Sequence, residues 1–200
     1  MRKTWSPSAE RNRIPIARAL SPLLNKSDEV LELGSGTGQH VCYFSERFPD
    51  VRWQPTERPV QLADLRDRTS ELDRWNLASP IALDINQQPW PVDSADVCLT
   101  INTLHIISWA AVKVVFGGAS TVLPIGGKLC VYGPMIINGQ HTSAGNQNFD
   151  RTLRAAEPLS GIRDLDKLEA LALQNGFLPG QCTDMPANNA FVVWTRSESN

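Results

Sequence analysis

Three glycines spaced two residues apart, Gly34, Gly36 and Gly38, form the segment whose residue types most directly indicate a ligand site. They lie between a short apolar stretch, residues 30–33, and a stretch with helical spacing. Small residues at such a junction let a ligand approach the backbone, and the start of the helix offers unpaired N–H groups. A dinucleotide site normally carries G-x-G-x-x-G, so the spacing here favours a different ligand.

Glu32 stands two residues before the first glycine and completes the pattern E-x-G-x-G-x-G. This pattern resembles motif I of class I methyltransferases, in which the loop contacts the methionine half of S-adenosylmethionine (SAM). The resemblance implies SAM as the cofactor. It also implies that the cofactor contacts include Glu32 and the loop itself, which consists of Gly34, Ser35, Gly36, Thr37 and Gly38. A tight glycine turn without a ligand is the alternative.

Residues at the ends of the next predicted strands suit the nucleoside half of such a cofactor. Glu57 comes about twenty residues after the loop, where an acid accepts hydrogen bonds from both ribose hydroxyls. Asp84 and Ile85 offer a carboxylate for the adenine amino group and an apolar face for its ring. Asn102 ends a fourth strand, where ligands bind in open α/β sheets. The alternatives are a solvated carboxylate for Glu57 and an ordinary turn for Asp84.

Several residues are candidates for the side of the site that receives the methyl group. His105 or Glu10 could take a proton from a hydroxyl, a carboxyl or a protonated amine, whereas a thiolate or neutral amine needs no base. Asn12 is a further catalytic candidate, and Tyr132 and Asn148 are candidates for the wall of the acceptor pocket. The alternatives are a packing role for His105 and an ordinary turn after Tyr132.

The polar segment 6–12 precedes the first predicted helix and is expected to fold over the glycine loop as a lid. In that arrangement Glu10, Arg11 and Asn12 face the cofactor or the acceptor. Arg11 would then bind a carboxylate in a bidentate manner. The alternative is a solvated helix start, because Ser6 followed by Pro7 also fits an N-cap and a first helical position.

The elements that must position these residues alternate between strands and helices, which predicts a mostly parallel sheet covered on both faces. Apolar runs and periodicity predict strands over residues 30–33, 51–55, 81–83, 97–101, 128–132, 177–182 and 190–195. They predict helices over residues 15–24, 39–47, 59–75, 108–123 and 164–175. Residues 133–163 are predicted to be irregular. The last two strands, joined without a helix, are expected to form an antiparallel edge.

Composition limits the partners that the protein can have. Its 200 residues carry 19 Lys and Arg against 21 Asp and Glu, a formal charge of −2, which is no footprint for a polyanion. No apolar run approaches the length of a membrane span, and the four cysteines have no metal-binding spacing. We therefore expect a cytoplasmic protein, monomeric or homodimeric, without nucleic-acid, membrane or metal binding. We expect one domain over residues 1–200, with a lid and helix over 6–24 and a frayed tail over 196–200.

The whole chain also resembles domain-of-unknown-function family 938, whose eukaryotic members are called methyltransferase-like proteins. The resemblance rests on residues 6–12, 35–40, 53–55, 83–84, 104–106 with Trp109, 132–134, 148–150, 161–164 and 185–189. It implies an α/β, Rossmann-like class I methyltransferase fold, with a mostly parallel seven-stranded sheet and an antiparallel edge strand. The family implies no substrate. Glu57 stands where many relatives carry Asp, which preserves the carboxylate.

The sequence thus predicts a SAM-dependent methyltransferase with a small-molecule acceptor. After the fourth strand it reads Asn102-Thr103-Leu104-His105 in place of the N/D-P-P-Y/F motif of enzymes that methylate nucleic-acid amino groups. It also lacks a Pro-Cys nucleophile of the cytosine C5 type. A protein methyltransferase and a non-catalytic SAM-binding sensor or scaffold remain the alternatives.

Overall fold

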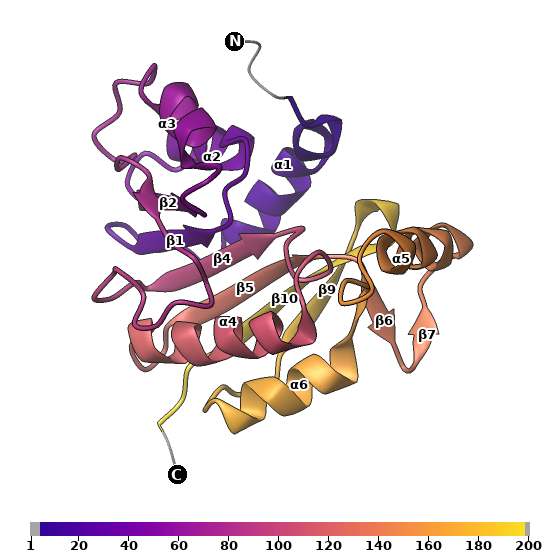
Figure 1. Ribbon diagram of the computed structural model, residues 1–200. Coiled ribbons are helices and arrows are strands. Elements are labelled where there is room, and N and C mark those ends of the chain that lie inside the picture. Colours follow the sequence, from indigo (N-terminus) through magenta and orange to yellow (C-terminus); the bar gives the residue numbers. More distant parts are fainter. Residues whose placement is uncertain (1–4, 199–200) are drawn as a thin grey trace.

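A seven-stranded sheet forms the centre of the computed structural model, which describes residues 5–198 (Figure 1). The strand order is β3-β2-β1-β4-β5-β10-β9, and β10 alone runs against the other strands. The strands of this sheet are β1 (Glu29–Leu33), β2 (Arg52–Glu57), β3 (Ile81–Ala82), β4 (Val97–Ile101), β5 (Lys128–Gly133), β9 (Gln181–Met185) and β10 (Asn189–Thr195). The α/β class, the mostly parallel sheet and the antiparallel last strand pair are confirmed.

Helices cover both faces of this sheet (Figure 1). One face carries α1 (Pro7–Leu20), α2 (Gln39–Arg47) and α3 (Leu62–Thr69), and the other carries α4 (Trp109–Val122) and α6 (Leu165–Gln174). Successive residues of a strand point to opposite faces, so the strands feed two apolar cores. Tyr132 packs in the core under α1 and α2, whereas its neighbour Val131 packs in the core under α4 and α6.

The first helix begins eight residues earlier than the apolar periodicity predicts. Ser6 is its N-cap, and the Ser6 hydroxyl accepts a hydrogen bond from the N–H of Ala9 at 3.3 Å. Pro7 takes the first helical position, where its missing N–H has no cost. The helix start proposed as the alternative to a lid is therefore present, and the helix ends at Leu20 instead of residue 24.

The predicted helix over residues 59–75 is reduced to α3, residues 62–69. The reason lies in Asn76, whose buried amide donates to the carbonyls of Ser45, Phe48 and Val51 at 3.0–3.1 Å. These bonds hold the chain against the end of α2 and the start of β2. The leucine-spaced, charged sequence after Thr69 forms turns and irregular backbone.

Residues 133–163, predicted to be irregular, contain a regular lobe beside the main sheet (Figure 1). A small sheet of β6 (Met135–Ile137), β7 (Gln140–His141) and β8 (Arg163–Asp164) stands next to α5 (Ala144–Ala156). Asp150 is the one buried residue of α5. Phe149, Leu153 and Ala156 recur at helical spacing, so α5 is amphipathic, and the prediction of irregular structure here was wrong.

The chain after β10 is anchored through Ser197. The N–H of Arg196 donates to the carbonyl of Gly127 at 2.8 Å, and the N–H of Ser197 donates to that of Gly176 at 2.9 Å. The expected fraying from residue 196 therefore does not occur at these two positions, and residues 199–200 lie outside the described residues. Within residues 5–198, no helix combines the length and the apolar character needed to cross a membrane.

Candidate functional site

The glycine loop joins β1 to α2 in a conformation that requires glycine. Gly34, Gly36 and Gly38 all have left-handed φ angles, between 54° and 74°. A Cβ at Gly38 would lie 2.7 Å from a methyl carbon of Leu65 in α3, whereas a Cβ at Gly36 would meet nothing within 4 Å. The backbone is therefore open to a ligand at Gly36 and closely packed at Gly38.

Glu57, the last residue of β2, holds this loop from the side. Its Oε2 accepts a hydrogen bond from the N–H of Gly36 at 2.8 Å, and its Oε1 accepts one from the N–H of Arg58 at 2.9 Å. Loop and strand are also joined by Ser35, whose N–H donates to the carbonyl of Thr56 at 2.8 Å. Because each carboxylate oxygen has a second lone pair, Glu57 can still accept hydrogen bonds from a ligand.

A cavity of about 500 Å³ opens at the carboxyl ends of these strands. Six of the residues predicted to contact the cofactor line it, namely Gly34, Gly36, Glu57, Asp84, Ile85 and Asn102. Residues outside the predicted cofactor contacts line it as well, among them Arg58, Gln61, Thr103, Ile106, Ile107, Ser108 and Ala111. These residues belong to the segments that follow β2 and β4, as far as the first turn of α4, so only their position after a strand could have indicated them.

The cavity has apolar walls and also a carboxylate in its lining. Ile85 approaches from the segment after β3, and Ile106 and Ile107 approach from the β4–α4 segment, which gives the cavity apolar walls. Asp84 begins a turn, since its Oδ1 accepts hydrogen bonds from the backbone and the side chain of Asn86 at 3.0 and 3.2 Å. The turn considered for Asp84 is therefore present, and Asp84 still lines the cavity.

Glu32 is buried and is not among the described residues that line this cavity. The pKa of its carboxyl group is raised to about 7. Burial is the largest cause; a hydrogen bond from Ser35 lowers the pKa, and the charge of Glu57 raises it. Its Oε2 is buried and has no hydrogen-bond partner among residues 5–198. Ser35, Thr37 and Gly38 likewise do not line the cavity.

His105 is a buried residue beside the cavity, outside its lining. Its ring meets that of Phe149 edge to face, with 5.4 Å between centroids, and Gly133 lies on another side. Burial, together with the charge of Arg163, lowers the pKa of His105 to about 4. A histidine with this pKa is neutral at pH 7 and a weak base.

The residues of the proposed lid belong to α1 and lie outside the cavity lining. Glu10 forms an ion pair with Arg13, and Arg11 is exposed and donates to the hydroxyl of Ser8 at 3.3 Å. The start of α1 nevertheless contacts α2, the helix that follows the glycine loop. The N–H of Ser6 donates to Oε1 of Gln39 at 2.6 Å, and Nε2 of Gln39 donates to the carbonyl of Ser6 at 3.2 Å.

A chain of buried polar groups continues from α1 across the carboxyl ends of the strands. Oδ1 of Asn12 lies 2.7 Å from Nε2 of His40, and the Tyr132 hydroxyl hydrogen-bonds with Asn12 and Asn189. Burial, together with the charge of Arg13, lowers the pKa of His40 to about 4, so this ring is neutral at pH 7. The structure thus brings two predicted site residues, Asn12 and Tyr132, together.

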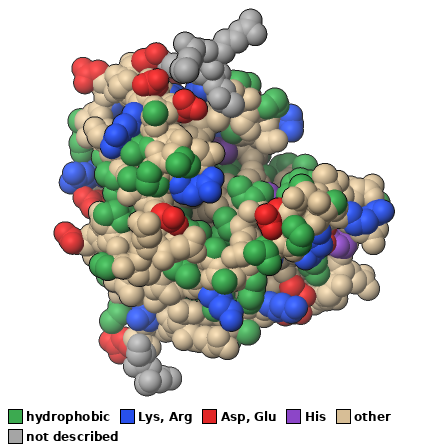
Figure 2. Space-filling view, viewed as in Figure 1, with side chains coloured by type: hydrophobic (Ala, Val, Ile, Leu, Met, Phe, Trp, Pro, Cys, Tyr) green, Lys and Arg blue, Asp and Glu red, His purple; other side chains and the backbone are tan. Residues whose placement is uncertain are grey.

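Asn148 is not part of this group. It is exposed on α5, and its side chain accepts a hydrogen bond from Arg151 of the same helix. Its neighbour Phe149 makes the contact with His105 instead. Figure 2 shows a hollow between the part of the molecule that carries α2 and α3 and the lobe that carries α5, with histidine side chains visible in it.

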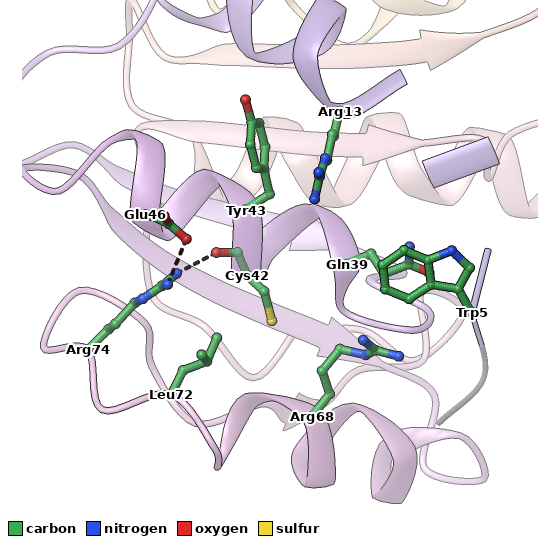
Figure 3. Close-up of a pocket in the computed structure, with 9 residues that line it drawn as sticks. All are labelled: Trp5, Arg13, Gln39, Cys42, Tyr43, Glu46, Arg68, Leu72 and Arg74. Atoms are coloured by element: carbon green, nitrogen blue, oxygen red, sulfur yellow. Dashed lines mark hydrogen bonds and ion pairs between the residues drawn. The ribbon is translucent and has the colours of Figure 1, made fainter. Parts of the chain in front are cut away.

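A second, smaller pocket of about 200 Å³ lies along α2 and α3 (Figure 3). Its cationic side chains are engaged by neighbouring groups. Arg74 binds Glu46 at 2.9 Å and the carbonyl of Cys42 at 2.5 Å. Arg13 stacks on Tyr43 as well as binding Glu10. This pocket is separate from the cavity beside the glycine loop, with which it shares no lining residue.

Solved structures of methyltransferases share this fold. The SAM-dependent methyltransferase SibL, in its apo form, is 19% identical with a TM-score of 0.80, over 95% of this chain and 56% of SibL. Human N-acetylserotonin methyltransferase in complex with SAM is 15% identical with a TM-score of 0.78, over 94% and 52%. CalO1, a methyltransferase of calicheamicin biosynthesis in its S-adenosylhomocysteine-bound form, is 18% identical with a TM-score of 0.79, over 95% and 54%.

The chain spans about half the length of each of these proteins, and the similarity shows that its fold is the class I methyltransferase fold. The family whose pattern covers nearly the whole sequence is described as "Protein of unknown function (DUF938)", with residues 3–196 matched. The chain therefore belongs to the DUF938 family.

Proposed function

We propose that the protein is a SAM-dependent methyltransferase that acts on a small-molecule acceptor. The observation that carries this proposal is Glu57, a carboxylate in the cavity wall that is hydrogen-bonded to the N–H of Gly36. Its remaining lone pairs suit the two hydroxyls of a ribose. The structures of human N-acetylserotonin methyltransferase with SAM and of CalO1 with S-adenosylhomocysteine support the same cofactor for this fold.

The size and the walls of the cavity fit SAM. Its volume of about 500 Å³ falls within the range of about 300–1,000 Å³ for small-molecule sites. Ile85 and Ile107 would hold the adenine ring, and Asp84 would accept from its amino group. Gly34 and Thr103 would flank the methionine half, since a Cβ at Gly34 would lie only 3.3 Å from Oγ1 of Thr103.

Bound SAM supplies a methyl group that its sulfonium already activates. The protein then has to align the acceptor and exclude water. A strong base is absent from the predicted positions, because His105 has a pKa of about 4 and Glu10 is paired with Arg13. This arrangement favours an acceptor atom that needs little help to lose a proton.

The acceptor is assigned to the hollow between the part of the molecule that carries α2 and α3 and the lobe that carries α5 (Figure 2). We assign to its walls four side chains that are uncharged at pH 7: Asn12, His105, Tyr132 and Phe149. A formal charge of −2 provides no cationic excess for a polynucleotide. Human N-acetylserotonin methyltransferase, by its name, acts on a small molecule.

The function is tested with SAM labelled in its methyl group. Purified protein and labelled SAM are incubated in three separate reactions. The first contains a metabolite extract, the second total RNA and DNA, and the third a protein extract. Label in a low-mass product is the expected result. At a SAM concentration below saturation, Glu57→Ala should transfer less label than wild type, whereas Glu29→Ala, which changes an exposed carboxylate at the start of β1, should transfer as much. Label mainly in polynucleotide or protein would contradict the assigned acceptor class. SAM binding without transfer in any fraction would contradict catalysis and favour a sensor or scaffold.

A further inference from the structure

The segment between β4 and α4 is held along its length by one short stretch of the α5 lobe. The N–H of Gly161 donates to the carbonyl of His105 at 2.9 Å, and the Ser160 hydroxyl donates to that of Ile106 at 3.1 Å. Arg163 supplies the two outer bonds: its Nε donates to the carbonyl of Leu104 at 2.8 Å, and its Nη2 donates to that of residue 107. Four successive carbonyls, residues 104–107, are therefore all bound from residues 160–163.

This segment is also a wall of the cofactor cavity. Thr103, Ile106, Ile107 and Ser108 line the cavity from it. Carbonyls that all point toward residues 160–163 fix the direction of the backbone between them. The bonds made by the α5 lobe therefore determine where the apolar side chains of this wall stand.

Arg163 is itself firmly held in the lobe. It is 7% exposed and lies in β8, where it pairs with Met135 of β6. The preceding residue, Ile162, donates its N–H to Oδ1 of Asp150 at 2.7 Å, and Asp150 also binds Arg154. The guanidinium is planar with several fixed donors, so one rigid group spans two carbonyls three residues apart.

We propose that Arg163 is a positioning residue for the cofactor: it holds residues 104–107 in the shape that completes the cavity wall, without touching the cofactor itself. The inference rests on the proposed function. Because Ile107 belongs to the part of the wall assigned to adenine, the effect of Arg163 falls on the nucleoside half. Adenosine and S-adenosylhomocysteine should therefore lose affinity together when Arg163 is changed.

The test measures the binding of S-adenosylhomocysteine and of adenosine by calorimetry, and hydrogen exchange over residues 104–108. Arg163→Gln should weaken both ligands by about tenfold, since hydrogen bonds from a charged group are lost, and should speed exchange in this segment. Arg163→Lys should behave like Arg163→Gln, because a single ammonium group cannot donate to both carbonyls that the guanidinium binds. Arg151→Gln on α5 is the matched control and should bind as wild type.

Melting temperature separates positioning from a general loss of structure, because binding is measured well below it. If Arg163→Gln does not fold, Ser160→Ala, which removes one of the four bonds, should still weaken both ligands about threefold. Unchanged affinity and unchanged exchange in a folded Arg163→Gln protein, or in Ser160→Ala, would overturn the inference. Wild-type protein that binds neither ligand would instead contradict the proposed function, and the inference with it.

Discussion

Oδ1 of Asn12 in α1 lies 2.7 Å from Nε2 of His40 in the first turn of α2, and both side chains are buried. Asn12 also bonds the Tyr132 hydroxyl, so it joins the first helix to the loop's helix and to the end of β5. Replacing it with alanine would leave buried polar groups without partners. We expect Asn12→Ala to lower the free energy of unfolding by about 1–3 kcal/mol.

Urea unfolding of Asn12→Ala measures this loss. Arg11→Ala is the control, because Arg11 is the neighbouring residue on the same helix and is exposed. Its free energy of unfolding should stay within about 0.5 kcal/mol of wild type. Equal stability of the two variants would mean that the Asn12–His40 contact does not hold α1 in place.

Glu32 should make the protein less stable as the pH rises. Its pKa is raised from 4.5 to about 7 in the folded protein, so between these values the folded state binds a proton that the unfolded state has lost. The contribution is fully favourable below pH 4.5 and is lost as the pH rises to 7, by up to about 3 kcal/mol. Glu32→Gln removes this dependence, so its stability relative to wild type should increase over this window.

The measurement is urea unfolding of wild type and Glu32→Gln at intervals from pH 4.5 to pH 8. The difference between the two proteins isolates Glu32, because His40 and His105 act in the opposite direction in both. Glu29→Gln on the same strand controls for the loss of a carboxylate. A difference that stays constant with pH would show that Glu32 is ionised throughout in the folded protein.

The loop glycines should differ in what they tolerate. Gly36 and Gly38 both have positive φ, so an alanine at either position costs about 1–2 kcal/mol in backbone strain. At Gly38 the new Cβ would also approach Leu65 to 2.7 Å, which adds about 1–3 kcal/mol of overpacking. Urea unfolding should therefore find Gly38→Ala clearly less stable than Gly36→Ala. Equal losses would mean that α3 can move away from the loop at no cost.

Six residues of the cavity lining can be predicted from the sequence because they belong to local patterns at the ends of strands. Gly34, Gly36, Glu57 and Asp84 each end a strand or follow one, and a parallel sheet brings its strand ends together at one edge. The same reasoning places Asn102 in the cavity wall. At these positions, strand position and residue type were sufficient to predict that the residue lines the cavity.

The other side of the site depends on contacts between distant segments, which no local pattern reveals. Arg163 binds carbonyls of residues 104–107, more than fifty positions earlier, and Asn12 meets His40 and Tyr132. Helix α5 was not predicted, although Phe149, Leu153 and Ala156 recur at helical spacing, because its apolar residues are few and separated by polar ones. His105 could be recognised as a candidate by type and position, whereas the burial that lowers its pKa depends on tertiary structure.

The central claim is that Glu57 holds the ribose of SAM, and calorimetric titration of S-adenosylhomocysteine into wild type, Glu57→Gln and Glu57→Ala tests it most directly. Glu57→Gln keeps an oxygen for the N–H of Gly36 but loses the charge, whereas Glu57→Ala loses both. The Glu57→Ala variant should bind about ten- to a hundredfold more weakly, with Glu57→Gln between it and wild type. Glu29→Ala should bind as wild type, and NAD should bind more weakly than S-adenosylhomocysteine. Unchanged affinity in a folded Glu57→Ala protein, or tighter binding of NAD, would contradict the account.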